Sequence, residues 1–503
     1  MERITQYGGN RGLSALILIS MTLAGCASPL AKYETDIPPM RSVSPASSLI
    51  NHGDDERSTK FGDAPNVGGT EEDALPLIHA NSSLVDCLRY AALENKGLES
   101  AYYAWRSAVE QSPQVTALPD PRFTYGYFIN EVETRVGPQQ HRLQFAQTLP
   151  WFNKLNLRGE VADANARAAY ERFEGKKVAV FDRVRRAYDE LFYLRRAITL
   201  TGENLELLQQ FEGVATQKYR VGMAQYADVI RVQVEIGKLE DRLLKLKDLR
   251  SPLTANLNAA LNRSPDAEVP WPDDITDETL DADESQILTW LGETNPELIA
   301  FDEEMNRERL RSKLAKLDYY PDVTLGMTYV VTNHAVNPNL TESGDDAVLA
   351  SVSVNVPIHP EKYSAGVRQA IANRLSKAKA KEDRRDRLNA EVKQAIFQHD
   401  DAQRRIGLYR DTLVPKARES LKASLAGFEG GKTRFLDLID TERTLLEFEL
   451  LFERARADRA NAISQLERLV GKTLPTKTQV TGTGSDTKQN HPENEMNNKE
   501  SSK

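Results

Sequence analysis

The sequence predicts a mainly α-helical fold with a membrane β-barrel contribution, built from two copies of one long unit. The motif at 219–230 recurs 209 positions later at 428–439, and the motif at 121–126 recurs 200 positions later at 321–326. Each copy holds two short segments of alternating polarity, then two long segments with apolar residues every three or four positions. The first pattern indicates strands and the second indicates coiled-coil helices. A repeat this long indicates two similar halves rather than a short-repeat solenoid.

The start of the chain has the pattern of a secretory signal peptide. Two arginines precede an apolar run at 13–23, which is too short to span a bilayer as a permanent helix. The run ends in Leu-Ala-Gly-Cys, which resembles a bacterial lipobox, in which the cysteine is lipid-modified and begins the mature chain. We therefore expect residues 1–25 to be removed and Cys26 to be lipidated; the alternative is an ordinary signal peptide with a chance cysteine. Ala27, in place of an Asp retention signal, favours delivery to the outer membrane.

Two polar segments flank the expected body. Residues 26–79 are expected to form a lipidated tether, because Ser, Pro, Gly and Asp are abundant between 40 and 73. Residues 473–503 are mostly polar, and we expect them to be disordered. Cys87 is the only cysteine besides Cys26, so no intramolecular disulfide is expected, and its apolar neighbours predict burial.

Each repeat is expected to begin with a helix followed by a pair of strands. The expected strands span about 122–130 and 141–149 in the first repeat and about 322–331 and 347–356 in the second. Alternation gives each strand one apolar face, and nine or ten residues is the length that a tilted strand needs to cross a membrane. The alternative is a soluble hairpin packed on a helix. Two such hairpins in a lipoprotein, each with a polar distal loop, favour the membrane, and we expect the loops to face the cell exterior.

The long helices are expected to pair as antiparallel rods within repeats at 80–262 and 291–472, separated by an equatorial connector at 263–290. The expected helices span about 153–218, 224–262, 363–427 and 433–471. An outgoing rod of this length would extend roughly 100 Å at 1.5 Å per residue. Pro252 and Pro415 should bend or interrupt their rods. Rods this long are suited to bridging a gap rather than to building a compact globule.

The sequence shows no sign of catalysis. It contains no Gly-rich phosphate loop, nucleophile elbow or paired-His helix, and its histidines lack metal-ligand spacing. His399 lies on the apolar stripe of a long helix, where we expect a hydrogen-bonded side chain rather than a ligand. The net charge of −9 is modest, with basic and acidic residues interspersed, which does not indicate a nucleic-acid surface. We therefore expect no enzyme activity, no cofactor and no bound metal.

The strand count predicts an oligomer. Four strands cannot close a barrel, and open sheet edges are not tolerated in lipid, so several chains must share one sheet. Two chains would give eight strands, whose interior is filled by side chains. Three chains would give twelve strands and leave a lumen, so a conducting protein requires at least a trimer.

This layout resembles the TolC family of outer-membrane efflux ducts over residues 80 to 472. The most specific segments are 414–417, 428–432, 435–441 and 469–471, and the residues at 147–151 point to the lipoprotein branch that serves resistance-nodulation-division pumps, including metal-efflux systems. The resemblance implies a homotrimer with a twelve-stranded barrel, an α-helical periplasmic tunnel and an equatorial collar. It also implies a periplasmic adaptor and an inner-membrane pump as partners. Phe428 stands where Tyr is common in the family, so a gate hydrogen bond through that hydroxyl cannot form.

The turns between the rods are the expected functional ends. Gly222 and Gly431 should adopt positive φ there. The resemblance implies that two tip motifs contact the adaptor, namely Val221, Gly222 and Met223 in the first repeat and Gly430, Gly431 and Lys432 in the second. The alternative is that these residues are only turns.

Acidic residues follow each turn. Asp437 and Asp440 lie three residues apart, so both can occupy one helix face. Since the family's constriction aspartates match these positions, we expect them to ring a narrow periplasmic entrance, with Asp228 adding further carboxylates. In the alternative, Asp437 and Asp440 are solvated or pair with Arg434 and Arg443.

The functional prediction is a passive exit duct of a tripartite efflux system in the outer membrane. One alternative is a duct for type I protein secretion. Another, from a different class, is a structural lipoprotein that uses its coiled coils as a periplasmic spacer. The amphipathic strands argue against a pure spacer, because a spacer has no use for them. The sequence does not name the exported compound.

Overall fold

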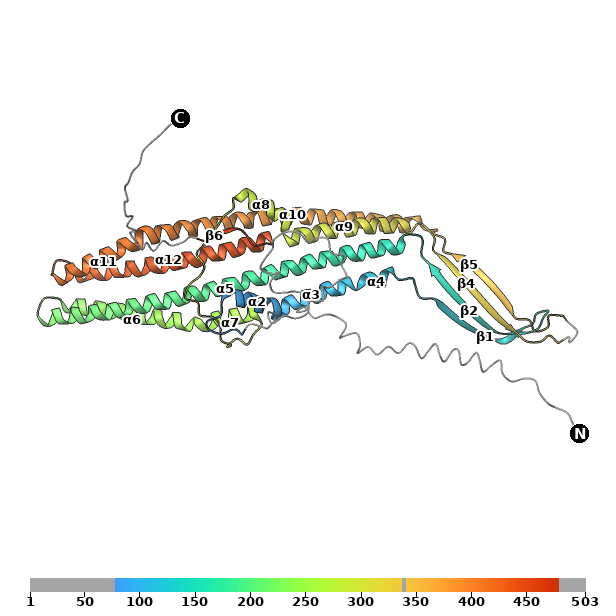
Figure 1. Cartoon of the computed structure of the whole chain (residues 1–503), viewed down its shortest axis with the longest axis horizontal. Coiled ribbons are helices and arrows are strands. Elements are labelled where there is room, and N and C mark those ends of the chain that lie inside the picture. Colours follow the sequence, from blue (N-terminus) through green and yellow to red (C-terminus); the bar gives the residue numbers. More distant parts are fainter. Residues whose placement is uncertain (1–76, 337–340, 479–503) are drawn as a thin grey trace, which may run out of the picture.

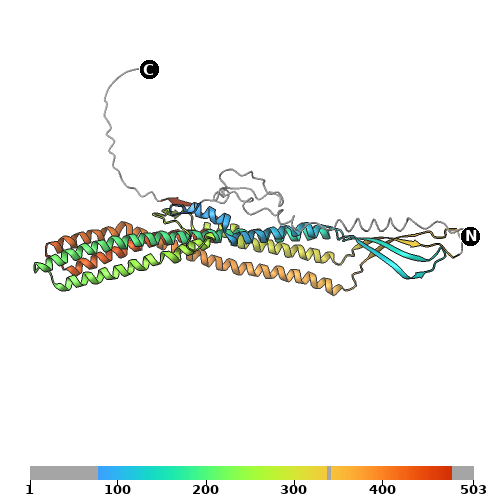
Figure 2. The ribbon, with the colours of Figure 1, turned by 90° about the horizontal axis from the view of Figure 1, so that it is seen from below.

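The computed structural model describes residues 77–336 and 341–478 of the chain. The molecule is a long rod with a four-stranded sheet at one end (Figure 1). At the other end lie two turns, each of which connects a pair of antiparallel helices. Seen from below, the rod is thin relative to its length (Figure 2). Within the described ranges, no helix is both long and apolar enough to cross a bilayer. The expected signal peptide, most of the tether and Cys26 lie outside the described residues.

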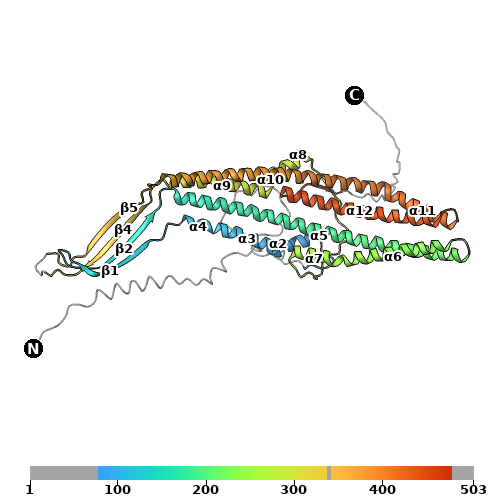
Figure 3. The same ribbon diagram turned by 180° about the vertical axis from the view of Figure 1, so that it is seen from behind.

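The first repeat contains three short helices, a hairpin and a pair of long helices. In chain order these are α2 (Leu84–Glu94), α3 (Lys96–Val109), α4 (Gln111–Thr116), β1 (Arg122–Val132), β2 (Gln139–Leu149), α5 (Lys154–Arg220), α6 (Tyr226–Asp248) and α7 (Arg250–Leu261). The 67 residues of α5 correspond to about 100 Å of helix. A single helix therefore extends from the sheet to the opposite end of the rod, as both Figure 1 and Figure 3 show.

The second repeat has the same order. Its elements are α8 (Glu284–Thr294), α9 (Pro296–Leu317), β4 (Val323–Thr332), β5 (Ala347–Val354), α10 (Pro360–Leu408), the π turn η5 (Tyr409–Leu413), α11 (Val414–Glu429) and α12 (Phe435–Val470). The short strand β3 (Glu278–Leu280) precedes this repeat and β6 (Thr476–Thr478) follows it.

The second repeat begins earlier than expected. The predicted connector at 263–290 ends too late, because α8 starts at Glu284, the position equivalent to Leu84 at the start of α2. Both helices begin with a capping box, around Ser83 in α2 and around Asp283 in α8. In each box the side chain of the first residue satisfies a free N–H group of the first helical turn. This boundary signal lay in the sequence and was missed.

Two buried asparagines show the duplication at atomic detail. Asn95 and Asn295 each accept a hydrogen bond from the backbone N–H three residues later and so cap the next helix. Each also donates through Nδ2 to a carbonyl of a distant helix, that of Ala260 at 2.8 Å and that of Leu469 at 2.7 Å. The two acceptor residues lie 209 positions apart in the sequence, which is also the spacing between Gly222 and Gly431. One side chain thus fixes a helix start and a tertiary contact in each repeat.

Matching apolar cores lie near the middle of the rod. In the first repeat, Cys87 of α2 and Leu257 of α7 pack with α5. In the second, the equivalent residues Ile287 of α8 and Leu466 of α12 pack with α10. Cys87 is fully buried as expected, and burial raises the pKa of its thiol to about 12. The thiol therefore serves as a small apolar group.

The start of the C-terminal segment is ordered, which corrects the prediction of disorder for 473–503. Residues 476–478 form β6, which pairs antiparallel with β3 in the connector. Leu474 is buried, and its N–H donates to the carboxylate of Glu467 at 3.1 Å. Backbone pairing needs no apolar side chains, so polar composition concealed the strand. Residues 479–503 lie outside the described residues.

Both prolines lie close to departures from regular α-helix. The helix containing Pro252 starts anew after a break at Leu249, so that α6 and α7 are separate. Pro415 is the second residue of α11 and follows the π turn η5. Proline has no N–H to donate to the carbonyl four residues earlier, which disrupts the regular α-helical ladder at this point.

Candidate functional site

The two helical turns have the same geometry. Gly222 has φ of +74° and Gly431 has φ of +73°, which confirms the expected positive values. In each turn the next residue donates its N–H to a carbonyl five residues back, at 2.8 Å from Met223 and 2.7 Å from Lys432. This bond closes the end of a helix around a left-handed glycine. Val221 and Met223 are 65% and 69% exposed, so the first turn presents apolar side chains at its surface.

Lys218 connects the two turns within one chain. Its ammonium donates to the carbonyl of Phe428 and, at 3.1 Å, to that of Glu429. It also lies 4.3 Å from the centre of the Phe428 ring. The repeat-equivalent position is Gly427, where an added Cβ would lie 2.2 Å from Thr433 Oγ1. The link is therefore made from one side only, and it was not predicted because its acceptors are backbone carbonyls of the other repeat.

The carboxylates expected at the entrance lie near these turns. Asp437 binds Arg434 at 3.0 Å, and Asp440 lies 3.7 Å from Arg443. The side chains of these aspartates are 44% and 74% exposed. A single chain therefore contains the arginine pairs of the alternative interpretation, while a ring of carboxylates requires neighbouring chains and stays a prediction.

Asp228, the third acidic residue of the predicted entrance, caps the start of α6. Its carboxylate accepts the backbone N–H of Gln225 at 3.3 Å, and Arg231 lies 3.6 Å away. Asp228 thus has a local structural role in the single chain, next to the first turn.

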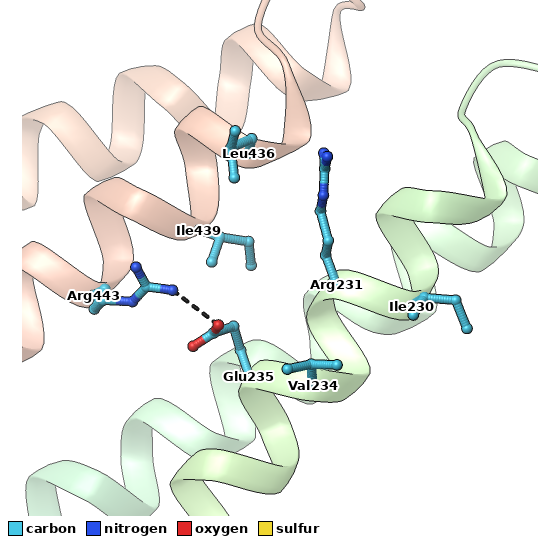
Figure 4. A pocket seen from close by; sticks show the side chains of 7 residues that line it. All are labelled: Ile230, Arg231, Val234, Glu235, Leu436, Ile439 and Arg443. Carbon is cyan, nitrogen blue, oxygen red and sulfur yellow. Dashed lines mark ion pairs between the residues drawn. The ribbon is translucent and has the colours of Figure 1, made fainter.

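A shallow groove lies between α6 and α12 beside these carboxylates (Figure 4). Its apolar part consists of Ile230, Val234, Leu436 and Ile439. Glu235 on α6 binds Arg443 on α12 at 2.9 Å and closes one side. Arg231 extends from α6 at the other side of the groove. The turn ends of the two helix pairs, α5–α6 and α11–α12, are thus joined by the Glu235–Arg443 ion pair as well as by Lys218.

One face of the sheet is apolar across all four strands. The order is β1-β2-β4-β5, and every neighbouring pair is antiparallel. The register aligns Tyr125, Leu143, Tyr329 and Val348 in one row. Tyr125 and Val348, at the two ends of this row, are 52% and 60% exposed. An exposed apolar face of this extent is typical of strands that contact lipid.

The opposite face is more polar. Thr124, Gln144 and Thr328 form one row of it, which ends in the apolar Leu349 on β5. Thr148 bonds Thr324 across the β2–β4 junction at 3.0 Å. This junction joins the two repeats into one sheet. In the described strands β1 and β5 each pair on one side only, so both outer edges of the sheet are open.

Aromatic residues gather where the sheet meets the helices. Trp151 stacks on Tyr320 with ring centres 5.2 Å apart, and Tyr319 contacts Tyr363 at 5.3 Å. Phe152 is 84% exposed beside them. Girdles of aromatic residues mark the two interfaces of membrane barrels. This belt is consistent with a membrane boundary at the junction.

The loops at the far end of the sheet contact each other. The N–H of Gly344 donates to the carbonyl of Val136 at 2.7 Å, and Arg135 binds Glu342 at 3.0 Å. Gly137 has φ of +135°, and an added Cβ would lie 1.7 Å from the carbonyl oxygen of Asn333. Only glycine fits this close approach of two chain segments.

His399 has the expected hydrogen-bonded role. The side chain is buried on α10, its Nε2 accepts the N–H of Leu280 at 3.3 Å, and Nδ1 lies 2.9 Å from Asp400. It therefore holds the connector strand β3 against the helices. Across the described part of the chain, no three His, Cys, Asp or Glu side chains are grouped so as to hold a metal ion.

An amphipathic sheet with open edges, continued by rods of about 100 Å, is typical of a membrane-inserted protein with a long helical extension. Residues 89–263 and 291–472 match the family model described as outer membrane efflux protein. The chain belongs to this family, and it is an outer-membrane efflux channel.

The chain matches two known relatives over most of their length. The chain is 21% identical to the cobalt-zinc-cadmium resistance protein CzcC of Cupriavidus metallidurans, over 78% of this chain and 90% of CzcC. It is 23% identical to the outer membrane protein TolC of Vibrio cholerae, over 72% of this chain and 83% of TolC. The crystal structure of CusC superposes with a TM-score of 0.66 at 14% identity, covering 78% of this chain and 93% of CusC. This last likeness concerns the fold.

Proposed function

We propose that three copies of this chain form the exit duct of a tripartite efflux system, with one continuous barrel and one helical tunnel. The observation that carries the proposal is the four-stranded amphipathic sheet with open edges at β1 and β5. In lipid those edges must pair, and the β1 edge of one chain can pair with the β5 edge of the next. Three copies supply twelve strands, which is wide enough for a lumen, whereas eight strands are filled by side chains.

The turns at the other end are the proposed docking site for a periplasmic adaptor, which connects the duct to an inner-membrane pump. The exposed side chains of Val221 and Met223 support this role. In the second repeat, Gly430, Gly431 and Lys432 form the equivalent surface. The pump supplies the energy and selects the substrate. The chain itself acts as a passive conduit, as the lack of catalytic motifs in its sequence suggests.

Asp437, Asp440 and Asp228 are proposed to surround the periplasmic entrance. Three chains would bring nine carboxylates together, and an acidic ring favours cations. CzcC, one relative, is named for cobalt, zinc and cadmium resistance. The acidic entrance is compatible with divalent cations as cargo of this duct.

The trimer can be tested by cross-linking the sheet edges. In a chain that carries cysteines at Thr124 on β1 and Ser353 on β5, oxidation in membranes should give covalent trimers on denaturing gels. Cys87 is fully buried, and a Cys87→Ala background removes any contribution from it. Single-cysteine chains are the control and should stay monomeric. A ladder that stops at dimers, or no cross-link at several neighbouring positions, would contradict the shared barrel.

Cys26 is proposed to carry lipid and to begin the mature chain. Acyl chains contribute about 0.8 kcal/mol per buried CH₂, so several chains anchor firmly, yet the barrel also holds the protein in the membrane. Cys26→Ser should therefore abolish acylation while correctly assembled trimers still reside in the outer membrane. Mass spectrometry of the mature N-terminus checks this. An unmodified Cys26, or a mature start at another residue, would rule it out.

A further inference from the structure

A polar layer interrupts the apolar seam between α5 and α12. On the turn side of it, one apolar cluster joins Leu208 of α5 to Leu438 of α12. On the connector side, a second cluster joins Leu200 to Leu446. Three of the buried residues between these levels are polar, namely Thr201 and Asn204 on α5 and Glu442 on α12. The buried apolar residues Ile439 and Leu445 of α12 belong to the neighbouring apolar clusters. We call the three polar residues the polar layer.

Each member of the polar layer is buried and incompletely bonded. Thr201, Asn204 and Glu442 are 0%, 6% and 3% exposed. Within the described part of the chain, Thr201 Oγ1, Asn204 Oδ1 and Glu442 Oε1 all lack a hydrogen-bond partner. A buried polar atom without a partner destabilises the folded state. Three such atoms at one level of the wall therefore mark it as a weak point between two well-packed clusters.

The rod formed by α10, η5 and α11 is irregular at the same level as the polar layer. The π turn η5 spans Tyr409–Leu413, which are the repeat counterparts of residues 200–204 on α5. Tyr409 packs with Leu445 and Phe448 of α12, so η5 lies beside the segment that carries Glu442. Turns of π-helix occur frequently at functional sites. Both repeats thus depart from regular packing at one height of the rod.

Among the described residues, the charges around Glu442 leave it without a counter-ion of its own. Burial is the main cause that raises the pKa of Glu442 from 4.5 to about 8, and the charge of Glu235 on α6 adds to it. Arg443 acts in the opposite direction, but its guanidinium binds Glu235 at 2.9 Å, as Figure 4 shows.

The charged groups that act on Glu442 are Arg443 and Glu235. Lys238 on α6 binds Glu235 at 2.8 Å, and on α11, which contacts α12 through Ser424 and Thr441, Arg418 binds Glu449 at 2.7 Å. From α5 the buried side chains are the neutral Thr201 and Asn204. In η5 the two charged residues, Arg410 and Asp411, bind each other at 2.8 Å.

We propose that Glu442 is a proton-controlled switch between the two helix pairs α5–α6 and α11–α12. Its neutral carboxyl keeps α5 and α12 packed, and its ionisation separates the turn ends of the two helix pairs. The neutral acid carries an O–H donor, whereas the ionised carboxylate can only accept and would face the unpaired Asn204 Oδ1 in the same layer. A carboxylate without a partner is costly in an apolar seam, and separation of the helices would hydrate it. The switch rests on the proposed duct, because separation of the turn ends of the two helix pairs would widen the periplasmic entrance of the duct.

The sign of the pH effect follows from the pKa. The folded chain keeps a proton on Glu442 that the unfolded chain has released, so folding stability falls as pH rises from about 4.5 to about 8 and then levels off. The packed state is therefore favoured at neutral pH and below, and the separated state above about pH 8.

Single-channel recording of the full-length protein in planar bilayers tests the switch. Wild-type open probability should rise several-fold between about pH 6 and about pH 9, on either side of the pKa of about 8. Glu442→Gln should stay closed across that range. Glu447→Gln is the matched control, since Glu447 is an exposed carboxylate on the same helix, and it should behave as wild type. A Glu442→Gln channel that keeps the wild-type pH dependence would overturn the proposal.

Thermal unfolding provides a readout that needs no conduction. The midpoint for wild type should fall between about pH 4.5 and about pH 8 by more than the midpoint for Glu442→Gln, and Glu442→Leu should match Glu442→Gln. If no variant conducts but this difference in unfolding midpoint persists, the proposed conducting trimer is refuted, whereas the buried protonated Glu442 is supported. Identical pH profiles for all chains would refute the switch even if the duct conducts.

Discussion

Lys218 joins the two helical turns of one chain, and its removal should loosen them. Lys218→Met keeps the aliphatic stem and deletes the ammonium that donates to Phe428 and Glu429. We expect a loss of about 1–2 kcal/mol in the free energy of unfolding, from one charged hydrogen bond and one cation–π contact. Chemical denaturation of the purified protein measures this loss.

Lys247→Met provides the comparison for that prediction. Lys247 is an exposed lysine near the end of α6, away from the turns, and its replacement should change stability by less than about 0.5 kcal/mol. Equal losses for the two variants would show that the Lys218 contact adds nothing.

Gly427 is required by a close approach rather than by its backbone conformation. An added Cβ would lie 2.2 Å from Thr433 Oγ1, so Gly427→Ala should shift the second turn and cost about 1–3 kcal/mol. Gly213→Ala is the control, because no atom lies within 4 Å of that position and alanine favours a helix by up to about 1 kcal/mol. Thermal unfolding should therefore move in opposite directions for the two variants. A stabilised Gly427→Ala protein would contradict the steric argument.

At the scale of elements, the two faces of the sheet should respond differently to charge. Val352 lies in register with Leu325 on the apolar face, and Ser353 lies in register with Thr324 on the polar face. Val352→Arg should destabilise the membrane-inserted protein by about 2–4 kcal/mol if it is near the bilayer midplane. Ser353→Arg should have little effect. Refolding yield into lipid vesicles distinguishes them, and equal yields would mean that the apolar face does not contact lipid.

Short elements show how tertiary pairing overrides composition. The strands of the membrane sheet were predictable because side-chain alternation is local and the apolar face is continuous. β6 was not, since its residues 476–478 are polar and gain order from the partner strand at 278–280, on the other side of the whole second repeat. The capping box at Asp283 was a local signal for the start of α8, which a search for apolar spacing alone overlooks.

At the scale of the whole molecule, the acidic entrance predicts ion selectivity. If three chains bring Asp437 and Asp440 close to one axis, the double substitution Asp437→Ala and Asp440→Ala should lower cation over anion selectivity and weaken block by multivalent cations added from the periplasmic side. Reversal potentials in a salt gradient measure the first effect and single-channel block measures the second. In the single chain both aspartates lie near arginines, Arg434 and Arg443. Unchanged selectivity and block would show that these pairs are their whole role.

The sequence by itself determined the duplicated unit, the amphipathic strands, the length of the rods and the positive φ of Gly222 and Gly431. All of these depend on interactions within a few residues, or on a period that a helix or strand imposes on its own side chains. The same local patterns indicated the burial of Cys87 and the hydrogen-bonded role of His399.

Only the tertiary structure decided which distant groups meet. The β2–β4 pairing, the contact of Lys218 with Phe428, the hydrogen bonds from Asn95 and Asn295 to distant carbonyls, and the polar layer around Glu442 all join residues that are far apart in the sequence. Backbone carbonyls and unpaired oxygens leave no periodic trace in a sequence, because any residue supplies a carbonyl and burial depends on the neighbour across the seam. Their positions follow from the packing of the long helices against one another.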